Sequence, residues 1–178
     1  MDIFEIDGPV RLSGSIDVAG SKNAALPIMA AALLASGESV IPNAPNLADI
    51  RSMETLLESL GATVRRDEKG LHIDAAVIDN PIGEYEIVRK MRASICILGP
   101  LLARCGKVKI SMPGGCAIGD RPVDIHLCGV KALGAKIHLE SGYIVAEAPA
   151  GGLVGTQIFL GGPFGSTVLG TDNVMMAA

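Results

Sequence analysis

The chain has 178 residues, of which 49% are hydrophobic and 19% charged, so it is long enough for one domain with a substantial core. Its net charge of -4 and its low aromatic content of 3%, without any Trp, argue against a nucleic-acid-binding surface. The longest uncharged stretch, residues 23–37, contains Pro27 and is shorter than the ~20 residues of a membrane span. The acidic N-terminus lacks the basic start of a secretory signal, which predicts a cytoplasmic protein.

The first predicted helix is rich in Ala and begins at Ser21, Lys22 and Asn23, in the stretch "KNAALPIMAAALLASG". Pro27 removes an amide that would otherwise bond back to Asn23, so we expect the opening turn to be loosened. Unpaired amides and the helix dipole favour an anion at such an N-terminus, and Lys22 adds positive charge there. Both an anion site and a solvated helix end agree with these residues.

An amphipathic helix is predicted next, with Asn46 as its N-cap and Gly61 as its C-terminal stop. Its apolar residues recur at helical spacing: Leu47, Ile50, Met53, Leu57 and Leu60. After Gly61, two short alternating segments joined by a charged turn that contains Gly predict a β-hairpin.

The same order of elements recurs along the chain. The passage "LGATVRRDEKGLHIDA" resembles "LGAKIHLESGYIVAEA", and small-residue helices begin near Lys22, Arg92 and Thr167, roughly seventy residues apart. We therefore predict an α+β fold of repeated βαβαββ units, two complete and a third begun. The last helix reaches Ala178 without a Gly, a Pro or a charged final turn, so we expect the chain to be part of a longer protein.

In the second unit, Lys90 and Arg92 occupy the helix start that matches Lys22. They too agree with either an anion site or a solvated helix end. The following stretch "PGGCAIGDRP", residues 113–122, predicts a surface loop because glycines permit sharp turns. Cys116 in this loop, near Arg121, has surroundings that favour a reactive thiolate, although a small residue tucked beneath its own loop would fit as well.

A further helix is expected after this loop, because Pro122 is tolerated in a first helical turn. Arg121 is then placed to hold an anion beside Cys116. Asp124 lies in the same turn, where it either satisfies the helix dipole or contacts a ligand.

The other Cys and His residues predict no metal site. The four cysteines lie far apart with no C-x-x-C pair, which argues against zinc and against a disulfide framework. Cys96 and Cys128 are predicted to be core residues, and Cys105 at a helix end to be structural. The three histidines lack the spacing of metal ligands.

Three motifs in this order, "GSKNAALPI", "MRASICILGPLLAR" and "PGGCAIGDRPVDIH", resemble the UDP-N-acetylglucosamine enolpyruvyl transferases of bacterial cell-wall synthesis. The resemblance covers the whole chain. It implies two similar domains of an inside-out α/β barrel-like fold, each with three repeat units, and an active site in the cleft between them. Residues 1–20 would then form strands of the second, mostly absent domain, and residues 21–178 an incomplete first domain.

The resemblance also implies the chemistry. The enolpyruvyl group of phosphoenolpyruvate would pass to the 3-hydroxyl of UDP-N-acetylglucosamine with release of phosphate, without a metal or an organic cofactor. Cys116 would be the general acid and form a covalent adduct, and the phosphoenolpyruvate anion would be held by Lys22, Arg92 and Arg121. The sugar nucleotide would contact Asn23, and its uridine the stretch Pro122, Val123, Asp124 and Ile125.

The general base implied by the resemblance is an Asp in the absent part, so we expect the 178 residues alone to have no turnover. Ile125 replaces the more familiar Leu. The segment "GGPFGSTVLGT" is longer than expected, so no nucleotide contact is assigned to it.

Two other functions are weighed against this one. An enolpyruvylshikimate-phosphate synthase shares the fold and the reaction type, but its pattern lacks the loop cysteine. A non-catalytic module that binds nucleotide-sugars belongs to another class, and the unfinished third unit speaks against it. No nucleic-acid or membrane partner is expected.

Overall fold

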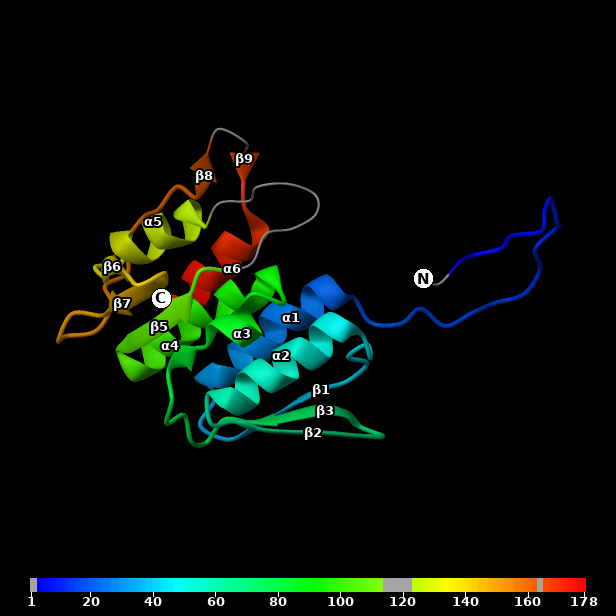
Figure 1. Ribbon diagram of the computed structural model, residues 1–178, viewed down its shortest axis with the longest axis horizontal. Helices are drawn as coiled ribbons and strands as arrows, with labels where there is room; N and C mark the ends of the chain where they lie inside the picture. The colour runs from blue at the N-terminus through cyan, green and yellow to red at the C-terminus, as the bar shows by residue number, and fades with distance from the viewer. Residues whose placement is uncertain (1–2, 114–122, 163–164) are drawn as a thin grey trace.

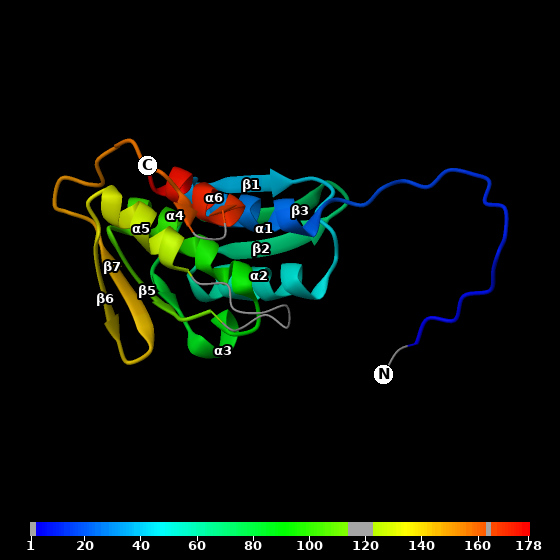
Figure 2. The same cartoon turned by 90° about the horizontal axis from the view of Figure 1, so that it is seen from above.

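The computed structural model describes residues 3–113, 123–162 and 165–178. Residues 3–20 form no helix or strand and extend away from the folded body (Figure 1, Figure 2). Their large apolar side chains are exposed: Ile3, Phe4, Ile6, Val10, Leu12, Ile16 and Val18.

The first unit pairs two helices with a three-stranded antiparallel sheet. Its elements are α1 (Lys22–Ala31), η1 (Ala32–Leu34), β1 (Glu38–Ile41), α2 (Ala48–Ser59), β2 (Thr63–Asp67) and β3 (Gly70–Asp74). The strand order is β1-β3-β2, with Val40 and Arg65 both opposite His72. Gly61 adopts a φ of 108° after α2, a conformation that favours Gly, so the predicted helix stop is confirmed.

The second unit repeats this plan. Its elements are β4 (Ile82–Gly83), α3 (Tyr85–Val88), η2 (Arg92–Ile97), α4 (Leu98–Cys105), β5 (Lys107–Ser111), α5 (Asp124–Ala132), β6 (Lys136–Glu140) and β7 (Tyr143–Glu147). The sheet order is β4-β5-β7-β6, with β4 parallel to β5 and the other neighbours antiparallel. Because β5-β7-β6 reproduces β1-β3-β2, the predicted repeat and both hairpins are confirmed. The first unit differs from the predicted βαβαββ order, since no strand among its described residues precedes α1 to match β4.

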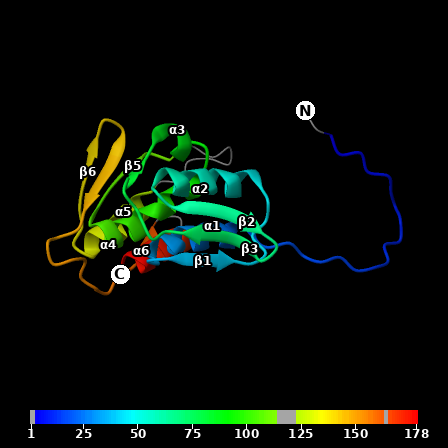
Figure 3. The same ribbon diagram turned by 90° about the horizontal axis from the view of Figure 1, so that it is seen from below.

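A third unit begins with the short hairpin of β8 (Gly161–Gly162) and β9 (Gly165–Ser166), followed by α6 (Val168–Ala177). The corresponding helices of the three units pack together: α1 contacts η2, and α6 contacts η2, α4 and α1. Figure 3 shows the two larger sheets on the outside of this helical core. The buried residues form one cluster that includes Met29, Ile50, Ile97 and Leu101.

Three predicted details are wrong. The N-cap of α2 is Leu47, because the Oδ1 atom of Asn46 accepts a hydrogen bond from the Arg51 guanidinium at 2.7 Å instead. Cys128 is exposed, because it lies on the outward face of α5. The helix expected from Arg92 begins as the tighter 3-10 helix η2 and becomes α-helical only at Leu98.

The contact between α4 and α6 depends on Gly99. A Cβ atom on Gly99 would overlap the main-chain carbonyl of Asn173, so no side-chain rotation relieves the clash. We expect Gly99→Ala to lower the free energy of unfolding by about 1–3 kcal/mol in urea titrations. Gly37→Ala is the control, since its Cβ would meet nothing within 4 Å. Equal effects of the two substitutions would contradict this account of the packing.

Candidate active site

The N-terminus of α1 carries the first two predicted substrate contacts. Ser21 caps the helix, with its Oγ accepting from the amide of Ala24 at 3.4 Å, and Lys22 is the first helical residue. Asn23 is exposed beside it. Pro27 lies inside α1 and has no N–H to donate to the Asn23 carbonyl, which agrees with the predicted loosening of the opening turn.

Lys22 forms an ion pair that sequence reasoning missed. Its Nζ lies 2.7 Å from Oδ2 of Asp49, and the two side chains are 40% and 37% exposed. Asp49 lies in the first turn of α2, where a carboxylate also satisfies the helix dipole. An acidic residue in the first turn of α2 was the one signal in the sequence, but it did not reveal that Lys22 is the partner of Asp49. The pair holds the Lys22 ammonium at the head of α1 while leaving it accessible to an anion.

Arg92 is the first residue of η2 and is half-buried. Because η2 packs against both α1 and α6, it places Arg92 at the head of a helix inside the core of the three units. Lys90 differs from the prediction: it is exposed, follows α3 and lines a separate hollow with Arg51 and Ile87. Only Arg92 therefore occupies the helix start that matches Lys22.

The predicted uridine stretch lies at the start of α5. Val123 is its buried N-cap residue, Asp124 is exposed in the first turn, and Ile125 is half-buried. A Cβ on Gly162 would lie 3.3 Å from the Ile125 side chain, so β8 runs beside this stretch. Cys116, Arg121 and Pro122 lie outside the described residues, and their assigned roles remain predictions.

Two buried polar side chains, Asn173 on α6 and His126 on α5, form a cluster that contacts η2 and α4. The Asn173 side chain accepts from the Gly99 amide at 2.6 Å and donates to the Ile95 carbonyl at 2.9 Å. Its Nδ2 also lies 3.1 Å from Nδ1 of His126. Burial lowers the pKa of His126 to about 4, and the positive charge of Arg92 acts in the same direction. Asp124 opposes this shift.

The low pKa of His126 makes stability depend on pH. Below the ordinary pKa of about 6.5 the unfolded chain binds a proton at this ring, whereas the folded chain stays neutral until about pH 4. The free energy of unfolding should therefore fall as the pH drops from 6.5 to 4, by on the order of 3 kcal/mol. Urea titrations should show a smaller fall in His126→Asn and an unchanged one in the exposed-site control His138→Asn. Parallel pH curves for all three proteins would contradict the assignment.

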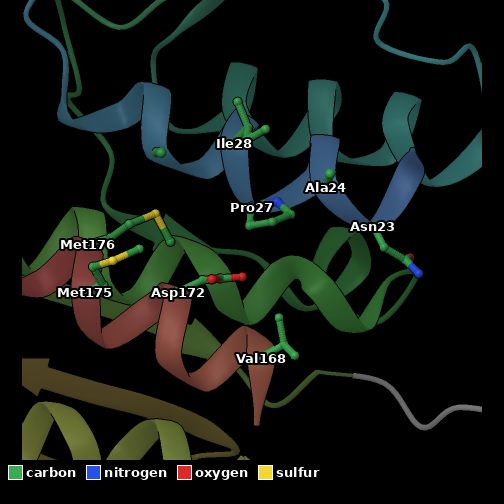
Figure 4. Close-up of a pocket in the computed structure, with 9 residues that line it drawn as sticks. Asn23, Ala24, Pro27, Ile28, Val168, Asp172, Met175 and Met176 are labelled. Carbon is green, nitrogen blue, oxygen red and sulfur yellow. The ribbon is translucent and has the colours of Figure 1, made fainter. Parts of the chain in front are cut away.

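A hollow of about 450 Å³ lies between α1 and α6. Figure 4 shows the two helices side by side, with Asn23 and Val168 toward the same end and Ile28 and Met176 toward the other. The described lining is mainly apolar and includes no Lys or Arg, with Asn23 and Asp172 as its polar residues. The described lining therefore offers no positively charged side chain to a phosphate.

Other reactive groups in the described part of the chain are buried or dispersed. Burial raises the pKa of Cys96 to about 12, so its thiol stays protonated at neutral pH. Within residues 3–113, 123–162 and 165–178, no three His, Cys, Asp or Glu side chains gather as metal ligands. No helix in those ranges is long and apolar enough to cross a membrane.

Comparison with known proteins supports the resemblance found in the sequence motifs. A relative in Methylacidiphilum infernorum, named UDP-N-acetylglucosamine 1-carboxyvinyltransferase, is 53% identical over all 178 residues. The chain spans 42% of that protein's length. The resemblance found in the motifs is thereby confirmed.

Solved structures share the fold. The enolpyruvyl transferase NikO from Streptomyces tendae superposes with a TM-score of 0.75 at 22% identity, over 94% of this chain and 38% of its own. An EPSP synthase from Acinetobacter baumannii gives 0.68 at 16% identity, over 92% and 37%. The predicted fold class, an incomplete part of an enolpyruvyl transferase fold, is confirmed. Residues 6–178 match the family model of EPSP synthase (3-phosphoshikimate 1-carboxyvinyltransferase), and the chain belongs to that family.

Proposed function

We propose that the chain is the N-terminal part of an enzyme that transfers the enolpyruvyl group of phosphoenolpyruvate to the 3-hydroxyl of UDP-N-acetylglucosamine. The observation that carries the proposal is the 53% identity over the whole chain to a relative of that name. The loop cysteine in "PGGCAIGDRPVD" supports the same acceptor against shikimate 3-phosphate. The reaction would serve peptidoglycan synthesis, and hence cell shape and division, in the cytoplasm.

The helix starts suit the binding of a polyanionic substrate. Lys22 and Arg92 begin helices of adjacent units that pack against each other, and helix N-termini favour negative charge. With Arg121 from the loop, they would pair with the phosphate and carboxylate of phosphoenolpyruvate through charge-assisted hydrogen bonds. Asn23 and the stretch 122–125 would hold the sugar nucleotide.

The proposed reaction is an addition followed by an elimination. Cys116 protonates the methylene carbon of phosphoenolpyruvate, and the 3-hydroxyl of the sugar attacks the positive C2 and loses its proton to a base. The resulting ketal expels phosphate and loses a methyl proton, which restores the vinyl group. Lys22, Arg92 and Arg121 would stabilise the phosphate as it leaves. The base is expected to come from the second domain.

The exposed segment at the N-terminus fits the proposed division into domains. Residues 3–20 make no helix or strand here and expose seven large apolar side chains. We assign residues 1–20 to the second domain and residues 21–178 to the first. A catalytic cleft between the domains would be incomplete in the 178 residues, which we expect to be inactive.

The test uses the full-length protein that contains these residues. It is incubated with phosphoenolpyruvate and either UDP-N-acetylglucosamine or shikimate 3-phosphate, and the enolpyruvyl product is identified by mass spectrometry. Product from the sugar nucleotide alone supports the proposal, whereas product from shikimate 3-phosphate alone refutes it. In parallel, turnover by the isolated 178 residues would overturn the expectation that the fragment is inactive.

A further inference from the structure

The contacts of Asn173 determine which of its side-chain atoms is oxygen and which is nitrogen. One side-chain atom accepts from the Gly99 main-chain amide at 2.6 Å, so it is the oxygen. The other donates to the Ile95 carbonyl at 2.9 Å, so it is the NH₂ nitrogen. Asn173 is fully buried, and both partners are main-chain groups that cannot change their roles. The orientation of the amide is therefore determined.

This orientation also determines the protonation of His126. The NH₂ group has a second proton, and its neighbour at 3.1 Å is Nδ1 of His126. Nδ1 must offer a lone pair to accept this proton, so the neutral ring carries its own proton on Nε2. His126 is 3% exposed, and no buried side-chain N or O among the described residues lacks a partner.

The cluster connects two parts of the proposed site. Ile95 belongs to η2, which begins with Arg92, and Gly99 follows in α4. His126 is the third residue of α5, whose N-cap is Val123. Asn173 on α6 bonds to both segments, although it is separated from them by 47 to 78 residues in the sequence.

Close packing restricts movement of the helices that Asn173 joins. A Cβ on Gly99 would overlap the Asn173 carbonyl, and one on Gly129 would overlap the Val174 side chain. The helices α4 and α5 therefore both approach α6 as closely as glycine allows. Shifting either helix along α6 would break hydrogen bonds in a region without access to water.

We propose that Asn173 is a positioning residue, which holds His126 as the Nε2–H tautomer and fixes the helix that begins with Arg92 relative to the stretch Val123–Ile125. It touches neither substrate in this role. The inference rests on the proposed function, since its consequence is the geometry of phosphoenolpyruvate and nucleotide binding. Neither Asn173 nor His126 was singled out as a site residue by the sequence motifs.

The first test determines directly which nitrogen of the His126 ring carries the proton. The full-length protein is labelled with ¹⁵N-His, and long-range ¹H–¹⁵N spectra are assigned with a His126→Gln variant. We expect His126 to show a bare Nδ1 and a protonated Nε2 near neutral pH. Asn173→Asp should move the proton to Nδ1, because a carboxylate there accepts rather than donates. A native ring protonated on Nδ1 would overturn the inference even if every Asn173 variant failed to fold.

The second test separates positioning from stability. In the full-length protein, Asn173→Asp and Asn173→Ala should raise KM for both substrates and lower kcat/KM on the order of ten- to a hundredfold. A mere loss of folded molecules would lower kcat at unchanged KM. The matched control is Asn80→Ala, which removes another amide that donates to a main-chain carbonyl, that of Ser59 at 3.0 Å.

The kinetic measurements distinguish failure of the proposed function from failure of the positioning role. Wild-type protein without turnover contradicts the proposed function. Wild-type turnover with KM unchanged in both Asn173 variants contradicts the positioning role alone, as does an equal rise in KM in the Asn80 control.

Discussion

Lys22→Ala in the full-length protein should lower kcat/KM for phosphoenolpyruvate on the order of 10²–10³-fold. The substitution removes a cation at the capped head of α1, where the helix dipole also favours an anion. The effect should appear in kcat as well as KM, because the departing phosphate carries more charge than the bound ester. Initial rates of phosphate release over a range of phosphoenolpyruvate concentrations measure both constants.

Asp49→Asn tests the ion pair separately. The amide keeps the size of the carboxylate but removes the charge 2.7 Å from the Lys22 ammonium. Because this pair is partly exposed, we expect a smaller loss in kcat/KM, of about tenfold or less. Lys69→Ala, on the exposed hairpin turn between β2 and β3, is the control and should leave the rate unchanged. A Lys22 variant as active as this control would remove Lys22 from the proposed site.

Cys116→Ser should lower turnover on the order of 10²–10⁴-fold, the contribution usual for a general acid. A hydroxyl is a much weaker acid than a thiol and a poorer nucleophile, so both proton donation and adduct formation should suffer. Intact-mass spectra after incubation with phosphoenolpyruvate should show an adduct on the native protein and none on the variant.

The other cysteines provide matched controls for this prediction. Cys128→Ser changes an exposed thiol on α5 and should retain both turnover and adduct. An adduct that persists in Cys116→Ser but disappears in Cys128→Ser would assign the reactive thiol to α5 instead.

Periodicity and glycine placement predicted the repeated units well, because each element is largely determined locally. The apolar spacing of α2 and the stop at Gly61 follow from helix geometry and from a φ of 108° that favours Gly. The N-cap of the same helix could not be predicted so readily. Asn46 bonds to Arg51 rather than to the helix amides, and that choice depends on a side chain one turn later.

Residues that act across units were harder to predict. Lys22 and Arg92 stand in recognisable motifs. Asp49, which pairs with Lys22, and Asn173, which bonds to the segment that begins with Arg92, come from other helices. Asn173 contacts residues 74 and 78 positions away, so no local pattern reveals it. The exposure of Cys128 was missed for a related reason: the face of α5 that is buried depends on where α6 packs.

Phosphate release from phosphoenolpyruvate by the full-length protein, with and without UDP-N-acetylglucosamine, tests the proposed function most directly. We predict release that requires the sugar nucleotide and is strongly reduced in Cys116→Ser. Release independent of the sugar nucleotide, or no release while the nucleotide still binds, would contradict the proposed transfer and favour a hydrolase or a nucleotide-sugar-binding module.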